Sequence, residues 1–193
     1  MKPGPSGNPW RSLGADGVTV QLVPHRPEWA LVFQMEAERI LRACGGTVVA
    51  VEHIGSTAVP GLVSKPILDI MPGIVRLEDG PGTIRPLEAL GYSCRGEHGI
   101  PGRLYFDLLR DGRSVAHAHM FVIGTEDWTR HLLFRDYLRG HPDAAREYAE
   151  LKIALATRYR EDRVSYTDVK TGFIRSIVER ARLDGESAAG PYR

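Results

Sequence analysis

Short runs of apolar and β-branched residues recur through the first two-thirds of the chain and predict β-strands. They cover residues 18–23, 47–52, 66–74, 91–95, 104–109 and 115–123. Between these runs, apolar residues at helical spacing predict one helix that opens at Pro27 and ends at Gly45, and another from Ile84 to Leu90. This part of the chain is therefore expected to form a sheet with helices packed against it.

The last third shows helical spacing only. We expect one helix over residues 128–139 and a second over 142–159. The pattern Ser165-x-x-Asp168 resembles a cap at the start of a third helix. The apolar stripe of this helix is Val169, Phe173, Ile177 and Ala181. The expected fold class is therefore α/β, of the α+β kind, with a mixed sheet flanked by helices and a helical C-terminal third.

Three connections carry further local signals. Asp111-Gly112 between two predicted strands indicates a hairpin. Residues 55–60, rich in Gly, Ser and Pro, predict a loop or tight turn. Pro72 and Gly73 should end the strand over residues 66–74 or disturb its pairing, because proline cannot donate to the ladder.

The length of 193 residues suits one domain of ordinary size. A flexible lead-in is expected over residues 1–16, which are rich in Pro and Gly, then a single domain over 17–184 and a loose tail over 185–193. The net charge of +1 argues against an extended nucleic-acid surface. No apolar run is long enough to cross a bilayer, and two cysteines give no disulfide framework, so a cytoplasmic protein is expected. A homo-oligomer is left open.

The segment from His53 to Met71 carries the clearest chemistry. A strand runs into Gly55-Ser56-Thr57, where a backbone without a Cβ and two hydroxyls can approach anionic oxygens. Lys65 then adds a positive charge and Asp69 a carboxylate on the next strand. A carboxylate among apolar neighbours needs a partner, such as a cation or a metal ion.

A Gly-Ser pair followed by a strand aspartate resembles the signature of polymerase-β-type nucleotidyltransferases, in which Gly-Ser holds phosphates and two strand carboxylates hold Mg²⁺. The longer strings HIGSTAVPGLVSKPILDI, GYSCRGEHGIPGRLYF, HAHMF and YTDVKTGFI resemble the GrpB family over about residues 20–181. This resemblance implies a nucleotidyltransferase-like fold, a nucleoside triphosphate as substrate and a divalent metal, Mg²⁺ or Mn²⁺ ahead of Zn²⁺. Related domains occur fused to dephospho-CoA kinase.

One residue departs from the transferase signature. Met71 stands where the second carboxylate is expected, and a thioether is a poor ligand for Mg²⁺. His117 and His119 share one strand face and can supply other donors. We therefore expect Asp69, His117 and His119 as metal ligands, and Asp69, Lys65 and His119 as catalytic residues.

The candidates for substrate binding combine the glycine-rich turn with cations and one tyrosine. They are His53, Gly55, Ser56, Thr57, Arg103, Arg135, Lys152, Tyr166 and Lys170. Structural alternatives stand beside these roles. Arg135 can pair with the adjacent Asp136, and Lys152 and Lys170 can lie on solvated helix faces. Asp107 is a weaker candidate to replace the missing carboxylate.

The leading functional hypothesis is a nucleotidyltransferase-like protein that binds a nucleotide or phosphorylated small molecule and transfers a nucleotidyl group to a small acceptor. A second hypothesis is a degenerate transferase fold that binds a phosphorylated metabolite without chemistry. A third is a metal-dependent hydrolase or lyase centred on His117 and His119. RNA binding is a weaker fourth.

Overall fold

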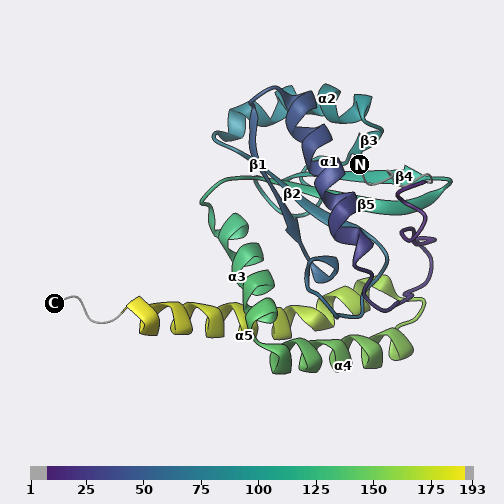
Figure 1. The fold of residues 1–193 in the computed structure, drawn as a ribbon, viewed down its shortest axis with the longest axis vertical. Coiled ribbons are helices and arrows are strands. Elements are labelled where there is room, and N and C mark those ends of the chain that lie inside the picture. The colour runs from purple at the N-terminus through teal and green to yellow at the C-terminus, as the bar shows by residue number, and fades with distance from the viewer. Residues whose placement is uncertain (1–7, 190–193) are drawn as a thin grey trace, which may run out of the picture.

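A five-stranded mixed sheet forms the centre of the fold in a computed structural model that describes residues 8–189, with side chains described up to residue 185. Its strands are β1 (Val48–Ile54), β2 (Leu68–Ile74), β3 (Tyr92–Cys94), β4 (Leu104–Arg110) and β5 (Arg113–Val122). The spatial order is β1-β2-β5-β4-β3, in which β2 and β5 are parallel and the other neighbours antiparallel. Figure 1 shows the helices on both sides of this sheet. The predicted mixed α/β class is confirmed.

Helices α1 (Glu28–Cys44) and α2 (Ile84–Ala89), with the 3₁₀ segment η2 (Leu77–Thr83), accompany one side of the sheet. Trp29 and Ile40 of α1 are fully buried against the strands. Burial of each such side chain stabilises the fold by roughly 1.5–3 kcal/mol. α1 ends at Gly45, whose φ of 54° is the left-handed conformation that favours glycine at a helix end.

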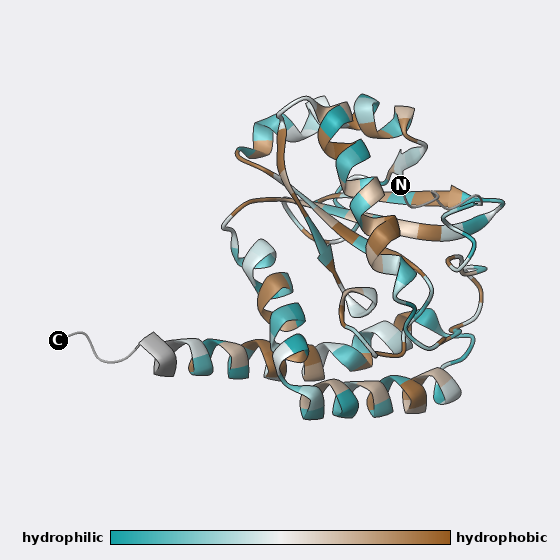
Figure 2. Ribbon diagram, viewed as in Figure 1, coloured by the Kyte–Doolittle hydropathy of each residue, from teal (hydrophilic) through white to brown (hydrophobic). Residues whose placement is uncertain are grey.

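The other side of the sheet meets the helical C-terminal region. It consists of α3 (Glu126–Gly140), α4 (Pro142–Arg158) and α5 (Arg163–Ala189). In Figure 2 these helices carry mixed hydrophilic and hydrophobic colours, whereas hydrophobic colour is frequent along the strands. Over residues 8–189, no helix is both long and apolar enough to cross a membrane.

Strand β2 has a different partner on each face. Leu68 and Ile70 join the core beneath α1, whereas Met71 packs with Trp128 of α3. The strand continues through Pro72 and Gly73, so these residues do not end it, and the alternative prediction, a disturbed pairing, is the one that holds. A register shift does occur opposite this region, between Val48 and Ala50 of β1. A Cβ on Gly73 would lie 2.8 Å from the Trp128 ring, so glycine permits α3 to pack closely on the sheet.

Several expectations at the ends of the domain are wrong. Trp10 and Leu13 are buried in the core beside α1, so residues 8–16 are not a loose lead-in; residues 1–7 lie outside the described part. The run over 18–23 forms no strand and contributes only an isolated bridge between Val23 and Ser64. Helix α5 extends through Ala189, into the predicted loose tail, and residues 190–193 lie outside the described part.

The third C-terminal helix begins earlier than the sequence pattern suggests. Its capping residue is Asp162, whose carboxylate accepts hydrogen bonds from the Ser165 backbone N–H at 3.0 Å and from the Ser165 hydroxyl at 2.6 Å. Ser165 therefore lies within the first turn rather than at the cap. The physical reason is that an aspartate three residues ahead of Ser165 satisfies the free N–H groups of that turn.

Candidate functional site

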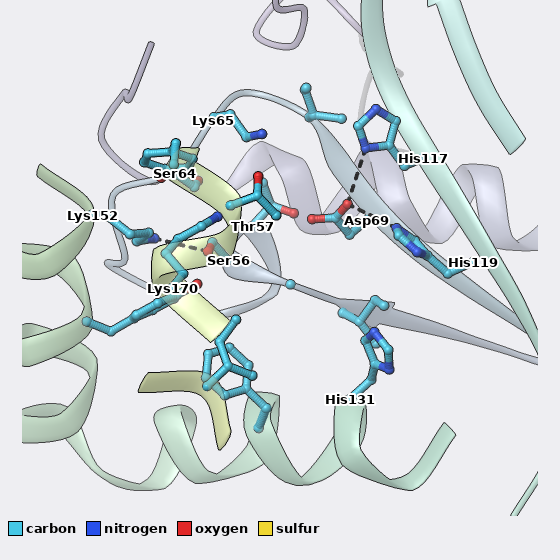
Figure 3. A pocket seen from close by; sticks show the side chains of 18 of the residues that line it. Ser56, Thr57, Ser64, Lys65, Asp69, His117, His119, His131, Lys152 and Lys170 are labelled. Atoms are coloured by element: carbon cyan, nitrogen blue, oxygen red, sulfur yellow. Dashed lines mark hydrogen bonds and ion pairs between the residues drawn. The ribbon is translucent and has the colours of Figure 1, made fainter. Parts of the chain in front are cut away.

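A cavity of about 430 Å³ lies where the sheet meets the C-terminal helices (Figure 3). This volume falls in the range of small-molecule sites, roughly 300–1,000 Å³. The cavity collects most of the residues that the sequence indicated. They are Gly55, Ser56, Thr57, Lys65, Asp69, Arg103, His117, His119, Lys152, Tyr166 and Lys170. These residues come from segments more than 100 positions apart, so the fold assembles the site.

The turn after β1 forms one wall of the cavity. Gly55 has φ 68° and ψ −168°, a conformation open to glycine only, and the 3₁₀ segment η1 (Ser56–Ala58) follows it. A Cβ on Gly55 would overlap the Asp69 carboxylate, so glycine lets turn and strand come together. Lys152 donates to the Ser56 hydroxyl oxygen at 3.0 Å and to the carbonyl of Val63. Helix α4 thereby holds the turn in place.

Three lysine ammonium groups face the cavity. Lys65 and Lys170 lie 5.7 Å and 4.1 Å from the centre of the same Tyr166 ring, and Lys152 lies 4.7 Å from that of Tyr148. Within residues 8–185, none of the three lysines forms an ion pair. Cation–π contacts stabilise the ammonium groups only in part.

Burial lowers the pKa of each of these lysines, because it disfavours the charged form. The pKa of Lys152 falls to about 7, with repulsion from Lys170 as the next cause, and the pKa of Lys170 falls to about 8. Attraction from Asp69 acts in the opposite direction at all three. An anion in the cavity would restore the charged forms.

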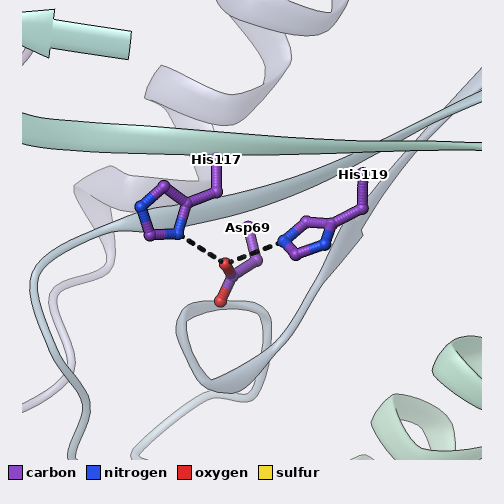
Figure 4. A group of neighbouring side chains, drawn as sticks. All are labelled: Asp69, His117 and His119. Atoms are coloured by element: carbon purple, nitrogen blue, oxygen red, sulfur yellow. Dashed lines mark ion pairs between the residues drawn. The ribbon is translucent and has the colours of Figure 1, made fainter. Parts of the chain in front are cut away.

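Asp69 lies between two histidines of β5 (Figure 4). Its Oδ1 is 3.6 Å from His117 Nδ1 and 3.5 Å from His119 Nε2. Burial raises the pKa of Asp69, but hydrogen bonding and attraction from the two imidazoles outweigh it and hold the pKa well below its usual range. Asp69 therefore remains ionised at neutral pH and is a weak proton acceptor.

Position 71, where the transferase signature has its second carboxylate, carries an apolar side chain and has apolar neighbours. Met71 is fully buried with Ile54, Phe121 and Trp128. The proposed substitute, Asp107, is paired with Arg95 at 2.5 Å and lines a separate, shallower hollow. Neither position supplies a second carboxylate beside Asp69.

His53 and Arg135 do not line this cavity, contrary to their predicted contact with a ligand. His53 is buried behind the turn, where its Nε2 lies 3.0 Å from Thr57 Oγ1 and its ring stacks on Phe33. Burial lowers the pKa of His53 to about 4. Arg135 binds Glu52 at 2.6 Å and Asp136 at 2.7 Å, so it joins α3 to β1. Both residues support the site from outside.

Other cavity residues were not indicated by the sequence. They are chiefly His98, Tyr105, Arg130, His131 and Arg163. Tyr105 pairs with His119 across the β4–β5 ladder, so the alternation of strand side chains would have found it once the register was known. His131 Nδ1 lies 2.6 Å from the Asp127 carbonyl one helical turn earlier, and burial lowers its pKa to about 4.

Together the fold and the site define a mixed α/β protein with a cationic pocket around one carboxylate and two histidines. Residues 19–180 match the family model described as GrpB protein. The chain belongs to the GrpB family.

Two relatives illustrate this membership. A UPF0157 protein of Pseudomonas aeruginosa is 41% identical over 181 residues, which cover 91% of this chain and 72% of that protein. The UPF0157 protein YqkA of Bacillus subtilis is 37% identical over 163 residues, 84% of this chain. The chain spans only 47% of YqkA.

A solved structure shares the fold. The crystal structure of the conserved protein GrpB from Enterococcus faecalis is 33% identical and superposes with a TM-score of 0.77. The match covers 83% of this chain and 96% of that one. The arrangement of sheet and helices is therefore that of a GrpB protein.

Proposed function

We propose that the cavity binds the phosphate groups of a nucleoside triphosphate or a related phosphorylated small molecule. The observation that carries this proposal is the convergence of Lys65, Lys152 and Lys170, without ion-pair partners in the described residues, on the Gly55-Ser56 turn. Buried charges are costly unless they are paired, and a phosphate supplies both negative charge and several acceptor oxygens.

The composition of the chain strengthens this proposal. The chain has 25 lysines and arginines together. Only four of them are lysines, and three of these four line the cavity. The other basic residues are arginines, of which Arg103, Arg130 and Arg163 also line the cavity. A lysine ammonium is a compact point charge that fits a crowded space and adjusts its protonation when buried, whereas guanidinium is larger and permanently charged. The three lysines therefore supply compact charges to the cavity beside its arginines, as a close-fitting phosphate site would require.

Nucleotidyl transfer is the reaction that the Gly-Ser and aspartate signature favours. The protein's own groups would then act on the phosphates: the turn and Lys152 would orient them, and Lys65 and Lys170 would offset their charge. The Mg²⁺ pair of polymerase-β-type transferases does not fit the residues present, because Met71 and its apolar neighbours replace the second carboxylate. No step is assigned to such a pair.

A second candidate follows from the same methionine. A cavity that holds phosphates without a pair of carboxylates can act as a binding module for a phosphorylated metabolite, with no turnover.

The acceptor that transfer would need is a small molecule rather than a nucleic acid, because the cationic groups are gathered in a cavity instead of along a surface.

Calorimetric titration with nucleoside triphosphates and inorganic triphosphate tests the binding proposal, and pyrophosphate release in the presence of Mg²⁺ or Mn²⁺ tests transfer. We expect binding by the wild type and at least tenfold weaker binding by Lys170→Met. The control is Arg146→Met, which removes an exposed cation whose one ion-pair partner among residues 8–185 is Asp143. Binding without pyrophosphate release, in assays that include a panel of small-molecule acceptors, would favour the second candidate, and absence of binding would contradict both.

A further inference from the structure

The cluster of Asp69, His117 and His119 has a donor set different from the one that the Mg²⁺ pair requires. We propose that these three residues bind one divalent transition-metal ion, such as Mn²⁺ or Zn²⁺, at the β2–β5 side of the cavity. The inference goes beyond phosphate binding, since it concerns a separate ligand held by separate residues.

The strands place the three donors together. Asp69 and His117 are partners in the parallel β2–β5 ladder, and His119 lies two residues further along the same face of β5. One donor atom from each residue lies within 4.8 Å of the other two. Donors at about 2.0–2.2 Å from one ion lie roughly 3–3.5 Å apart. The Asp69–His distances of 3.5 Å and 3.6 Å are already near this size, and only the histidines need to move closer.

The chemistry of the donors selects the class of ion. Two imidazoles and one carboxylate suit Mn²⁺, Fe²⁺ and Zn²⁺, whereas Mg²⁺ prefers oxygen ligands throughout. Three protein ligands leave further coordination positions for water or a phosphate oxygen, as in catalytic rather than structural sites. The side chains of His117 and His119 are each 17% exposed and that of Asp69 is 32% exposed, so these positions open into the cavity.

The hydrogen-bond partners of the two histidines make His117 more ready than His119 to bind a metal ion. His117 Nε2 lies 3.0 Å from the Ser114 hydroxyl, which can accept its N–H and leave Nδ1 free for a metal. His119 Nδ1 lies 3.3 Å from Arg103 Nη1, which is a donor only, so Nδ1 accepts and Nε2 carries the proton in the metal-free protein. Metal binding must therefore move that proton to Nδ1 and end the hydrogen bond with Arg103.

The cavity separates the metal ligands from most of the lysine charge. In Figure 3, His117 and His119 lie on one side of the pocket, and Lys152 and Lys170 on the other, with Asp69 between them. A dication beside Asp69 and lysines opposite would hold a polyphosphate between two positive walls. The metal site nevertheless stands on the three donors alone.

The test uses untagged protein stripped by a chelator and then titrated with Co²⁺, Mn²⁺, Zn²⁺ and Mg²⁺ in the absence of any nucleotide. Calorimetry gives stoichiometry and affinity, and the visible absorption of Co²⁺ reports its coordination geometry. We expect one transition-metal ion per chain and at least tenfold weaker Mg²⁺ binding. Failure here leaves the phosphate proposal untouched, because that proposal is measured with the lysine variants and without metal.

Substitutions of single residues test which side chains bind the metal ion. His117→Ala and His119→Gln should each weaken Co²⁺ binding at least tenfold, and circular dichroism should confirm that both fold. The matched control is His131→Gln, which changes a buried imidazole of the same cavity that lies outside the donor group. Arg103→Gln should bind Co²⁺ at least as tightly as the wild type, because a glutamine oxygen accepts the Nδ1 proton. The proposal is overturned if the wild type binds no transition metal, if Mg²⁺ binds as tightly as Co²⁺, if neither histidine variant weakens binding, or if Arg103→Gln abolishes it.

Discussion

The Cα of Gly55 lies so close to Asp69 that a Cβ at position 55 would come within 2.9 Å of the aspartate Cβ and overlap the carboxylate. The turn that is proposed to bind phosphates and the strand that carries the carboxylate are therefore packed as one unit. Glycine is required both for this approach and for its backbone conformation, with φ 68° and ψ −168°.

Gly55→Ala should destabilise the protein by about 1–3 kcal/mol and displace Asp69 from its histidines. Chemical denaturation measures the first effect, and Co²⁺ titration the second. Gly82→Ala is the control, because no atom lies within 4 Å of the added Cβ and the backbone there is not left-handed. Equal stability of the two variants would show that the close packing at Gly55 is not needed.

Lys170→Met should leave the ligand-free protein as stable as the wild type or more stable. Lys170 makes no hydrogen bond or ion pair among the described residues, and replacing an unpaired, partly buried charge by an apolar chain of similar length removes a desolvation cost. The same variant should lose the thermal stabilisation that nucleotides or triphosphate give the wild type. A variant that lost stability while keeping the ligand effect would show that Lys170 has a structural role.

Anion binding should weaken as the pH rises above about 7. Lys152 and Lys170 have pKa values lowered to about 7 and about 8 in the ligand-free protein, and a bound anion raises them. Below these values both lysines are already charged and affinity is constant. Above them binding must take up protons, so affinity falls by up to about tenfold per pH unit for each lysine. Calorimetry with sulfate, which does not titrate in this range, measures the effect, and a flat profile from pH 6 to 9 would refute it.

Arg135→Met should lower the free energy of unfolding by about 1–3 kcal/mol, because it leaves Glu52 and the His53 carbonyl without a charged donor. The ligand affinity of the folded variant should stay near that of the wild type, since Arg135 lies outside the cavity. Arg95→Met is the comparison. Its pair with Asp107 involves an arginine that is 53% exposed, so losing it should change the free energy of unfolding much less. If Arg135→Met kept the stability of the wild type but lost ligand binding, the result would support the original prediction that Arg135 binds substrate.

The sequence predicted the centre of the site because that centre is encoded locally. Gly55-Ser56 directly follows a strand, and Asp69, His117 and His119 alternate on strands whose faces follow from the pleat. Lys65 was predicted from the same segment. Lys152 and Lys170 were predicted only as cations that could bind phosphate, and helical spacing equally allowed a solvated face. Their shared contact with aromatic rings and the cavity depends on how α4 and α5 pack, which no local pattern states.

One of the missed residues, Tyr105, depends on an irregularity in the β4–β5 hairpin. The turn at Asp111-Gly112 pairs Arg110 with Arg113, and a regular ladder from there would place Phe106 opposite His117. A register shift between Leu108 and Leu109 instead places Asp107 opposite His117 and Tyr105 opposite His119. A shift of one residue turns every side chain to the other face, so Tyr105 enters the cavity wall only because of the bulge.

The burial of Trp10 and Leu13 was missed for a related reason. Short Pro- and Gly-rich segments have no periodicity, so their attachment to a core is visible only in three dimensions. The Leu13 segment is held by backbone bonds from Gly14 to Pro66 and from Ala15 to Ser114. These contacts lie next to the strands that carry the site.

The most direct measurement is a crystal structure of the protein with a non-hydrolysable nucleoside triphosphate analogue. The account predicts phosphate oxygens within hydrogen-bonding distance of the Gly55-Ser56 turn and of the ammonium groups of Lys65, Lys152 and Lys170. Phosphates bound elsewhere on the protein, with these lysines unengaged, would contradict it.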